Sequence, residues 1–403
     1  MHNHTTTKKD PETILETNIE HFKGLERALD MAEYYGFIGI KTPPIEKADI
    51  AVAKGFHGEI NTGSDFEKHA IRLDLDQRAA LLRMYTEHHN ILGQPAMVFY
   101  KTVGAKKPSF NLDIIGNSKS ISEALIIKTI LAIAEEEGYK HLSVRINSTG
   151  DRDSFSRFER EVAHYFKQHL NKLPAAHRQV FKKNPLGLLE CTDDVCLSVN
   201  AEAPQMMCFL SEPSRIHFKE TLEYLETLDI EYTISNTLLG NASFASQTVF
   251  EVYGSPTDNT KDSQLIAVGT RYNTLAKKVG LKKECYAVGA TIVLDKSPKC
   301  AKKHVYKTKK PQFFFIQFST DAKLKSLMVI DTLRCARIPV EHAITKDKLG
   351  AQMAEAESIK TSHILIMGQK EALENSVVVR DVITRSQESI DMKELGGYLK
   401  KLM

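Results

Sequence analysis

Two short apolar blocks, each with a glycine inside it, constrain the fold of this chain most strongly. Residues 265–273 read Leu-Ile-Ala-Val-Gly-Thr-Arg-Tyr-Asn, which predicts a strand that ends in a tight turn. Residues 287–296 read Ala-Val-Gly-Ala-Thr-Ile-Val-Leu-Asp-Lys. This second block predicts a buried strand, a glycine that permits close approach of another backbone, and the start of an apolar helix. Both blocks therefore belong in the interior of a protein that mixes helices and strands.

The charge and the cysteines of the 403-residue chain restrict its class. The net charge of +3 permits nucleic-acid binding where basic residues cluster, but does not require it. No run of eighteen apolar residues occurs, and residues 1–10 lack the apolar core of a signal peptide, so we expect a cytoplasmic protein with a disordered tail and no membrane span. The six cysteines show neither a CxxC pair nor zinc-site spacing with histidine. We therefore expect free thiols and no metal site.

The first third of the chain alternates helices and strands. Apolar residues at helical spacing predict one helix over residues 11–35, and a glycine, a strand and a proline follow within residues 36–46. Residues 71–85 change from alternating to helical spacing. Two strands then flank a basic loop, at residues 96–99, 101–107 and 110–116.

The rest of the chain has three distinct regions. An amphipathic helix is predicted at residues 120–137, and a strand at 142–146 leads into Asn-Ser-Thr-Gly-Asp. A mostly helical region at about 151–232 contains Asn-Pro-Leu-Gly-Leu-Leu-Glu-Cys, and Thr-Val-Phe-Glu stands at 248–251. After a lysine-rich stretch, residues 312–403 show a βαβαβ rhythm, a further apolar segment and a final helix.

In this order the segments resemble the histidyl-tRNA synthetases of class II. That family has Gly-Gly-Arg-Tyr-Asp-Gly-Leu at the first glycine block and Asn-Pro-Leu-Arg-Leu-Leu-Asp-Cys in its helical insertion. The resemblance implies an α/β (α+β) fold with an antiparallel-sheet catalytic core at residues 11–298 that contains the insertion at about 151–232. It also implies a basic linker at 299–311 and an α/β anticodon-binding-like domain at 312–403.

The resemblance also assigns site positions. The family's histidine pocket falls on Asp76, Asp113, Arg271 and Tyr272. The three arginines that hold the α-phosphate of ATP in the family fall on Tyr100, Gly240 and Lys296. Lys296 keeps a positive charge there, and Lys101 offers a second cation beside Tyr100. The ATP-site positions of this chain are therefore Lys101 and Lys296, and no catalytic residue is assigned.

These replacements bear on activity. Arginine grips a phosphate with a planar two-donor fork that tyrosine cannot reproduce. Loss of one such preorganised donor costs about 3 kcal/mol, or roughly 100-fold in rate. A pair of pocket tyrosines in the family falls here on Phe244 and Ala245, which removes a hydroxyl and a whole ring. We therefore expect a divergent paralogue with lost or strongly impaired adenylation, which acts as a homodimer in tRNA or other RNA binding or in regulation.

Two alternatives stay open. One is an active histidine–tRNA ligase that uses ATP and Mg²⁺ with rearranged clamps. The other is a regulatory subunit of ATP phosphoribosyltransferase in histidine biosynthesis, although that subunit usually lacks the anticodon-binding domain. If RNA binds, we expect contacts from the lysines of the linker, which are Lys302, Lys303, Lys307, Lys309 and Lys310.

Overall fold

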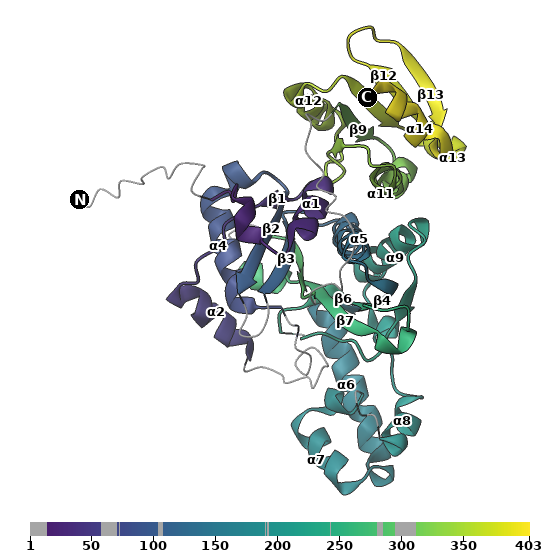
Figure 1. Ribbon diagram of the computed structural model, residues 1–403. Coiled ribbons are helices and arrows are strands. Elements are labelled where there is room, and N and C mark those ends of the chain that lie inside the picture. The colour runs from purple at the N-terminus through teal and green to yellow at the C-terminus, as the bar shows by residue number, and fades with distance from the viewer. Residues whose placement is uncertain are drawn as a thin grey trace, which may run out of the picture.

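The computed structural model describes residues 14–57, 71, 73–103, 108–189, 191, 193–241, 243–279, 285–294 and 312–403. Figure 1 shows a central sheet with its helices, a helical subdomain below it and an α/β domain above it. Within the described residues, none of the helices combines the length and the apolarity that a bilayer-spanning segment needs.

The central sheet has eight strands in the order β1-β2-β3-β8-β7-β6-β4-β5. The strands are β1 (Ile38–Gly39), β2 (Ala96–Val103), β3 (Pro108–Ile115), β4 (Lys140–Gly150), β5 (Tyr232–Ile234), β6 (Ser246–Ser255), β7 (Gln264–Arg271) and β8 (Ala287–Ile292). The two edge pairs, β1 with β2 and β5 with β4, are parallel, and the pairs between them are antiparallel. This arrangement confirms the antiparallel sheet expected for the catalytic core.

The two glycine blocks form β7 and β8, which pair with each other near the middle of the sheet. Strand β8 is fully buried, as its apolar sequence predicts. The helix expected to start within the second block is not present up to Leu294, because Val293 and Leu294 follow the strand without helical structure. Residues 295 and 296 lie outside the described part of the chain.

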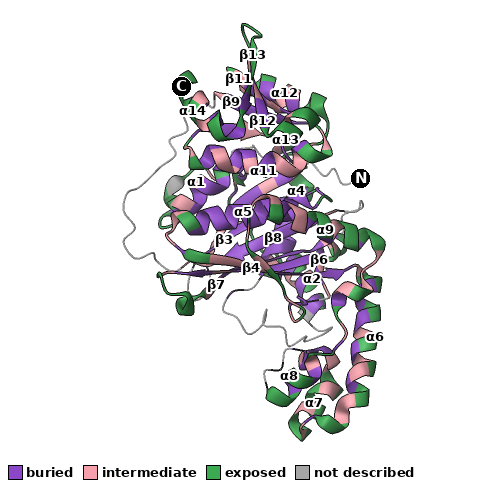
Figure 2. Ribbon diagram, turned by 90° about the vertical axis from the view of Figure 1, so that its right-hand side faces the viewer, coloured by how far each residue is buried: buried purple, intermediate pink, exposed green. Residues whose placement is uncertain are grey.

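One face of the sheet is covered by α1 (Glu26–Tyr34), α5 (Ile121–Glu136) and α9 (Glu212–Thr227), as Figure 2 shows. The predicted helix at 120–137 is confirmed as α5, but it is not amphipathic. Its residues are buried from Ile121 to Ala134 because the sheet lies on one side and α1 and α9 lie on the others. A helix that contacts protein all round has no need of a polar face.

The opposite face carries α2 (Lys47–His57), α4 (Leu75–Leu92) and α10 (Asn273–Lys278). These helices share a second apolar core with the strands beneath them, which includes Leu82 of α4, Tyr100 of β2 and Leu275 of α10. The candidate site described below lies within this layer.

The N-terminal segment corrects one expectation, because residues 11–35 do not form one helix. Leu15 instead bridges to Ile40. A short 3₁₀ helix, η2 (Ile19–Phe22), follows with Asn18 as its cap, and α1 begins only at Glu26. Gly24 separates the two pieces with φ +83°, a conformation that ends a helix.

The helical subdomain consists of α6 (Arg152–His169), η3 (Leu170–Lys172), α7 (Ala175–Lys183), η4 (Pro185–Leu188), α8 (Asp194–Asn200) and η5 (Met206–Phe209). Phe158, Val162 and Phe166 recur every four residues on α6 and are buried in a small apolar core of its own. Within the described residues of the expected insertion, α9 leaves this subdomain and packs on α5 and β4.

The C-terminal domain has a five-stranded sheet in the order β10-β9-β11-β12-β13. Its elements are β9 (Phe313–Gln317), α11 (Thr320–Cys335), β10 (Val340–His342), α12 (Leu349–Ile359), β11 (His363–Met367), α13 (Gln369–Glu374), β12 (Ser376–Asp381), β13 (Gln387–Asp391) and α14 (Met392–Leu402). The parallel strands β10, β9 and β11 confirm the predicted βαβαβ rhythm. Strand β13 pairs antiparallel with β12 and was not expected from the sequence.

Polar contacts join the C-terminal domain to the central one. Lys128 Nζ of α5 lies 2.9 Å from an Asp331 carboxylate oxygen of α11, and the Tyr35 hydroxyl donates to the same carboxylate at 2.8 Å. Arg334 of α11 donates to Glu135 of α5 at 2.7 Å. The carboxylate of Asp331 in the C-terminal domain thus contacts two groups of the central domain, the ammonium of Lys128 and the hydroxyl of Tyr35.

Candidate functional site

The candidate site lies on the sheet face that α4 covers. Strand register places Tyr100 opposite Asn111 and Asp113 opposite Gly289. Because side chains alternate along a strand, Tyr100, Asn111 and Asp113 all point to this face. Arg78 of α4 enters the same layer, so one guanidinium meets three polar side chains of the sheet in the interior.

Arg78 is held on all sides by protein. Its Nη1 donates to Asn111 Oδ1 at 3.1 Å and its Nη2 to the Ala290 carbonyl at 3.0 Å. Its Nε lies 3.5 Å from Asp113 Oδ1, and the Tyr272 hydroxyl donates to that same oxygen at 2.7 Å. Arg78, Asp113 and Tyr272 have no exposed surface. The arrangement is a closed polar cluster, which we call the Arg78 cluster (Arg78, Tyr100, Asn111, Asp113 and Tyr272).

Electrostatics within the cluster follow from its burial. Burial raises the pKa of Asp113 to about 6, although Arg78 and the hydroxyl of Tyr272 act in the opposite direction. Burial acts to lower the pKa of Arg78, but Asp113, Tyr100 and Tyr272 together outweigh it, so the pKa of Arg78 is raised. Burial also raises the pKa of Tyr100 and of Tyr272 well above the usual value. The cluster therefore contains one internal ion pair and two neutral phenols at neutral pH.

Gly289 makes this packing possible. A Cβ atom at this position would lie 1.7 Å from Asp113 Oδ1, so the carboxylate occupies the space directly above the glycine. Any other residue would displace Asp113 from both Arg78 and Tyr272. The close approach predicted for the glycine of the second block is thus an approach by a side chain.

The four residues predicted for the histidine pocket are not all brought together. Asp113 and Tyr272 meet in the Arg78 cluster, and Asp76 stands in the first turn of α4, half-buried. Arg271 faces the other side of the sheet because it precedes Tyr272 in the chain and ends β7. There it donates to Glu123 of α5 at 2.7 and 2.6 Å.

The Arg271–Glu123 pair is buried and tightly bonded. Arg271 also donates to the Asn117 carbonyl at 2.9 Å and to the Lys119 carbonyl at 3.2 Å, and His217 Nε2 lies 2.7 Å from Glu123. Burial acts to raise the pKa of Glu123, but Arg271 and then His217 outweigh it and lower this pKa to about 2. These contacts fasten α5 and α9 to β7.

Of the two ATP-site lysines, the structure describes only Lys101, and it points away from the cluster. Lys101 follows Tyr100 in β2 and so points to the opposite face, where its Nζ donates to the His21 carbonyl at 3.1 Å. Lys296 lies outside the described residues, and so do the five linker lysines. Among the described residues, the cation inside the cluster is Arg78, which sequence reasoning missed.

A sequence signal for Arg78 was available. It precedes the apolar run Ala79 to Leu82 in a helix, where a charged residue needs a buried partner. Arg83 lies on the side of α4 that contacts α2, 3.1 Å from an Asp49 carboxylate oxygen and 3.1 Å from Glu46 Oε1.

The position of Gly240 is filled by apolar groups. Gly240 has φ +62°, and a Cβ atom there would lie 2.8 Å from Val249 Cγ1 and 3.4 Å from Ala245 Cβ. Phe244 is buried and makes an edge contact with Phe56 at a centroid distance of 6.4 Å. The backbone at this point is therefore shaped for glycine and leaves little room for a longer side chain.

Replacing Gly240 with arginine is expected to lower the free energy of unfolding by about 2–4 kcal/mol, because left-handed backbone strain and overlap with Val249 add together. Urea denaturation of the purified protein measures the change. Gly350→Arg is the matched control, because Gly350 is exposed in the first turn of α12 and has open space around it. A Gly240→Arg variant as stable as the wild type would contradict this account.

Comparisons with known proteins give matches both for the C-terminal domain and for nearly the whole chain. Residues 312–402 match the family described as "Anticodon binding domain". The histidine–tRNA ligase of Desulforamulus reducens is 24% identical over 419 residues, covering 98% of this chain and 99% of that protein. The histidine–tRNA ligase of Vesicomyosocius okutanii is 26% identical over 416 residues, covering 96% of each. The crystal structure of apo S. aureus histidyl-tRNA synthetase superposes with a TM-score of 0.51 at 19% identity, covering 99% of this chain and 100% of that one.

The sheet of the central domain and the matching C-terminal domain define the class, a class II aminoacyl-tRNA synthetase-like catalytic domain followed by an anticodon-binding α/β domain. Within that class the chain belongs to the histidyl-tRNA synthetase family, as a distant homologue at about 24% identity over nearly its full length.

Proposed function

We propose that this chain is a divergent member of its family that activates histidine poorly or not at all and retains a role in binding tRNA or another RNA. The observation that carries the proposal is the Arg78 cluster. Its guanidinium is bound to Asp113, Asn111 and a backbone carbonyl, with no exposed surface. A cation used in this way is not available to an incoming phosphate.

The chemistry of histidine activation explains why this matters. A carboxylate attacks the α-phosphate of ATP, and the charge on the phosphate oxygens must be stabilised by preorganised cations. By resemblance, two of those cations fall on Tyr100 and Gly240. Tyr100 is buried and neutral, and Gly240 leaves space for little more than a hydrogen. Loss of one such donor lowers the rate of activation by a factor of about 10²–10³, so loss of two would lower it by a factor of roughly 10⁴–10⁶.

Histidine-dependent exchange of pyrophosphate into ATP tests the proposal, because it reports activation alone and requires no tRNA. We expect exchange at the background level. Sustained histidine-dependent exchange would instead favour an active ligase whose clamps lie in residues that the structure does not describe.

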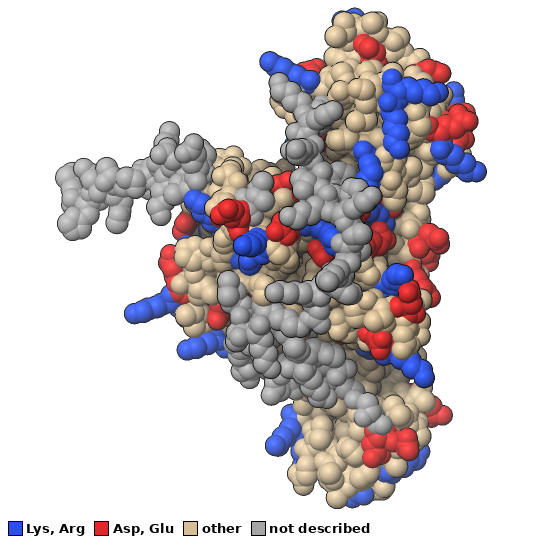
Figure 3. All heavy atoms as spheres, in the orientation of Figure 1, with Lys and Arg blue, Asp and Glu red and all other residues tan. Residues whose placement is uncertain are grey.

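An RNA-binding role is supported by the C-terminal domain, which matches the anticodon binding domain family over residues 312–402. Figure 3 shows Lys and Arg side chains standing out on this domain, with acidic side chains among them. Filter binding of total tRNA at rising salt tests the role, because phosphate contacts give an affinity that falls steeply with salt. Binding no tighter than that of an unrelated protein of similar charge would remove this part of the proposal.

A homodimer is also part of the proposal. Strand β1 is the last strand at one end of the sheet, and the segment that contains it exposes two large apolar side chains, Ile38 at 37% and Ile45 at 42%. Exposed apolar side chains that lie on one segment are typical of an interface. Sedimentation equilibrium would give the mass of a single chain if this is incorrect.

A cytoplasmic location completes the proposal. The five described cysteines are all free thiols, which is the usual state in a reducing compartment, and tRNA is found there.

A further inference from the structure

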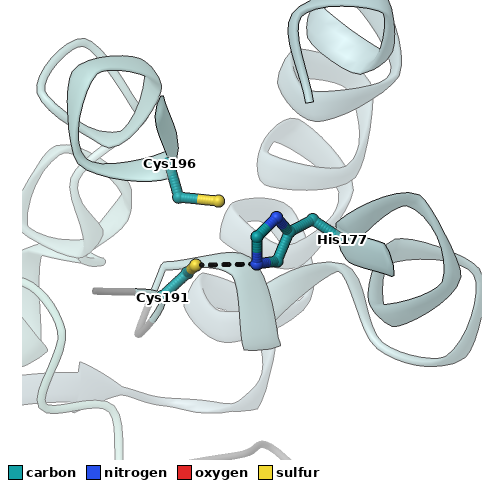
Figure 4. Close-up of side chains that lie close together, drawn as sticks. All are labelled: His177, Cys191 and Cys196. Carbon is teal, nitrogen blue, oxygen red and sulfur yellow. Dashed lines mark hydrogen bonds between the residues drawn. The ribbon is translucent and has the colours of Figure 1, made fainter. Parts of the chain in front are cut away.

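Three potential metal ligands from separate elements converge in the helical subdomain. His177 lies on α7, Cys191 follows η4, and Cys196 lies on α8. Figure 4 shows the imidazole of His177 and the two thiols pointing toward a common centre. One ligand atom from each residue lies within 4.8 Å of the other two, and His177 Nε2 is 3.4 Å from Cys191 Sγ. Among the described residues this group meets the spacing of a metal site.

The separations agree with tetrahedral coordination. Zinc binds thiolate sulfur at about 2.3 Å and imidazole nitrogen at about 2.0–2.1 Å, which places two tetrahedral ligands about 3.6 Å apart. The observed 3.4 Å between His177 Nε2 and Cys191 Sγ is close to that distance. The thiol of Cys196 lies within 4.8 Å of the other two ligand atoms, so a rotation of its side chain can bring it to a third corner.

We propose that His177, Cys191 and Cys196 bind one zinc ion, with a fourth position left to water or another ligand. Two thiolates and one imidazole are ligands that select zinc over magnesium or calcium, which prefer oxygen. Because this ion would lie in the helical subdomain, the proposal is independent of whether histidine is activated in the central domain.

The surroundings favour a bound cation. Cys196 is 1% exposed, and the Nδ1 atom of His177 is buried without a hydrogen-bond partner among the described residues. Zinc would displace the protons of the two thiols on binding.

The proposed ion would also explain how α7 is held. No residue of α7 is fully buried, and Val180 remains 39% exposed. Among the described residues of α7, the partly buried Phe181 packs against the apolar core of the subdomain. A zinc ion that joins His177 to Cys191 and Cys196 would fasten α7 to α8, in a subdomain too small to rely on its core alone.

This site could not be recognised from the sequence. His177 precedes both cysteines, and the spacing of thirteen residues and then four residues between the three ligands matches none of the usual zinc patterns. The fold brings the ligands together by turning the chain at η4 and at the start of α8. The expectation of no metal site considered neighbours in the sequence and not neighbours in space.

The experiment uses the full-length protein, purified under reducing conditions and stripped of metal with a chelator. Cobalt(II) is titrated in first, because a tetrahedral cobalt–thiolate site gives intense visible bands and a near-ultraviolet charge-transfer band. Zinc is then added to displace the cobalt, and bound metal is measured by plasma mass spectrometry. We expect about one ion per chain and loss of the cobalt bands on zinc addition.

Variants make the assignment specific. Cys191→Ser and Cys196→Ser should each reduce retained zinc from about one to below about 0.1 ion per chain, because two protein ligands hold zinc weakly. Cys208→Ser is the matched control, because Cys208 is an exposed cysteine of the same subdomain and should leave loading unchanged. The cobalt spectrum of the wild type does not depend on whether a variant folds.

Three results would overturn the proposal. One is a cobalt titration of the reduced wild-type protein without a charge-transfer band. Another is equal loss of zinc in Cys208→Ser and in Cys196→Ser. The third is a Cys191–Cys196 disulfide in the reduced preparation, detected by peptide mass spectrometry, which would assign the pair to redox chemistry.

Discussion

Replacing Arg271 with methionine is expected to lower the free energy of unfolding by about 3–5 kcal/mol. Methionine keeps most of the length of the side chain but leaves Glu123 without its main partner in a position that has no exposed surface. It also removes the donors to the carbonyls of Asn117 and Lys119. Urea denaturation followed by circular dichroism measures the loss.

Two further variants test the cause of this loss. Arg271→Met combined with Glu123→Gln should recover part of the stability, because the uncompensated buried charge has gone. Arg152→Met makes the same change at an exposed position and should alter stability by less than about 0.5 kcal/mol. An Arg271→Met protein as stable as Arg152→Met would show that the pair does not anchor α5, and would reopen Arg271 as a pocket residue.

Replacing Arg78 with methionine should cost about 3 kcal/mol at pH 7 through a different route. Asp113 would then be buried without its cation, and it would have to be protonated in the folded state. Protonating a carboxyl with an ordinary pKa of about 3.9 costs about 4 kcal/mol at pH 7, and about 3 kcal/mol of that is already present because the pKa of Asp113 is about 6 in the wild type, so the lost charge partner adds about 1 kcal/mol. The hydrogen bonds lost by the buried Asn111 side chain and Ala290 carbonyl add about 2 kcal/mol. Thermal and urea denaturation at pH 7 measure the change.

The pH dependence separates this cause from a simple packing defect. A folded-state pKa raised above the unfolded value means that the penalty is absent below the unfolded pKa and grows as pH rises through the folded pKa. Arg78→Met should therefore lose about 1 kcal/mol less stability at pH 4 than at pH 7. Compared with Asp113→Asn alone, the double variant Arg78→Met with Asp113→Asn should lose the same stability at pH 4 and at pH 7, because no carboxyl is left to titrate. If Arg78→Met lowers the free energy of unfolding equally at pH 4 and at pH 7, the Arg78–Asp113 ion pair is not the cause of the pH-dependent part of the loss.

Much of the fold could be predicted from the sequence because apolar periodicity reports burial directly. The glycine blocks gave β7 and β8, the apolar run gave α5, and the alternation near the end gave the βαβαβ domain. The prediction of one helix over residues 11–35 was wrong. Apolar residues continue at helical spacing across Gly24, but the positive φ of Gly24 interrupts the helix there. The short strand β13 was missed because four of its five residues are exposed and it lacks an apolar pattern.

The candidate site was predicted only in part, for a geometrical reason. Resemblance assigns residues to positions, but it does not say which face of the sheet each side chain occupies. Arg271 and Tyr272 are adjacent in the chain and point to opposite faces, as Tyr100 and Lys101 do. Arg78 was missed because its partners lie on β3 and β8, far away in the sequence.

The central claim is that cations needed at the α-phosphate of ATP are missing or internally bound. Pyrophosphate exchange tests it most directly when the folded protein is assayed with ATP, Mg²⁺ and saturating histidine beside a working histidine–tRNA ligase. We predict exchange indistinguishable from the reaction without histidine and at least roughly 10⁴-fold below the working ligase. Histidine-dependent exchange within about 100-fold of the working ligase would contradict the claim, because a loss of that size corresponds to one missing donor at most.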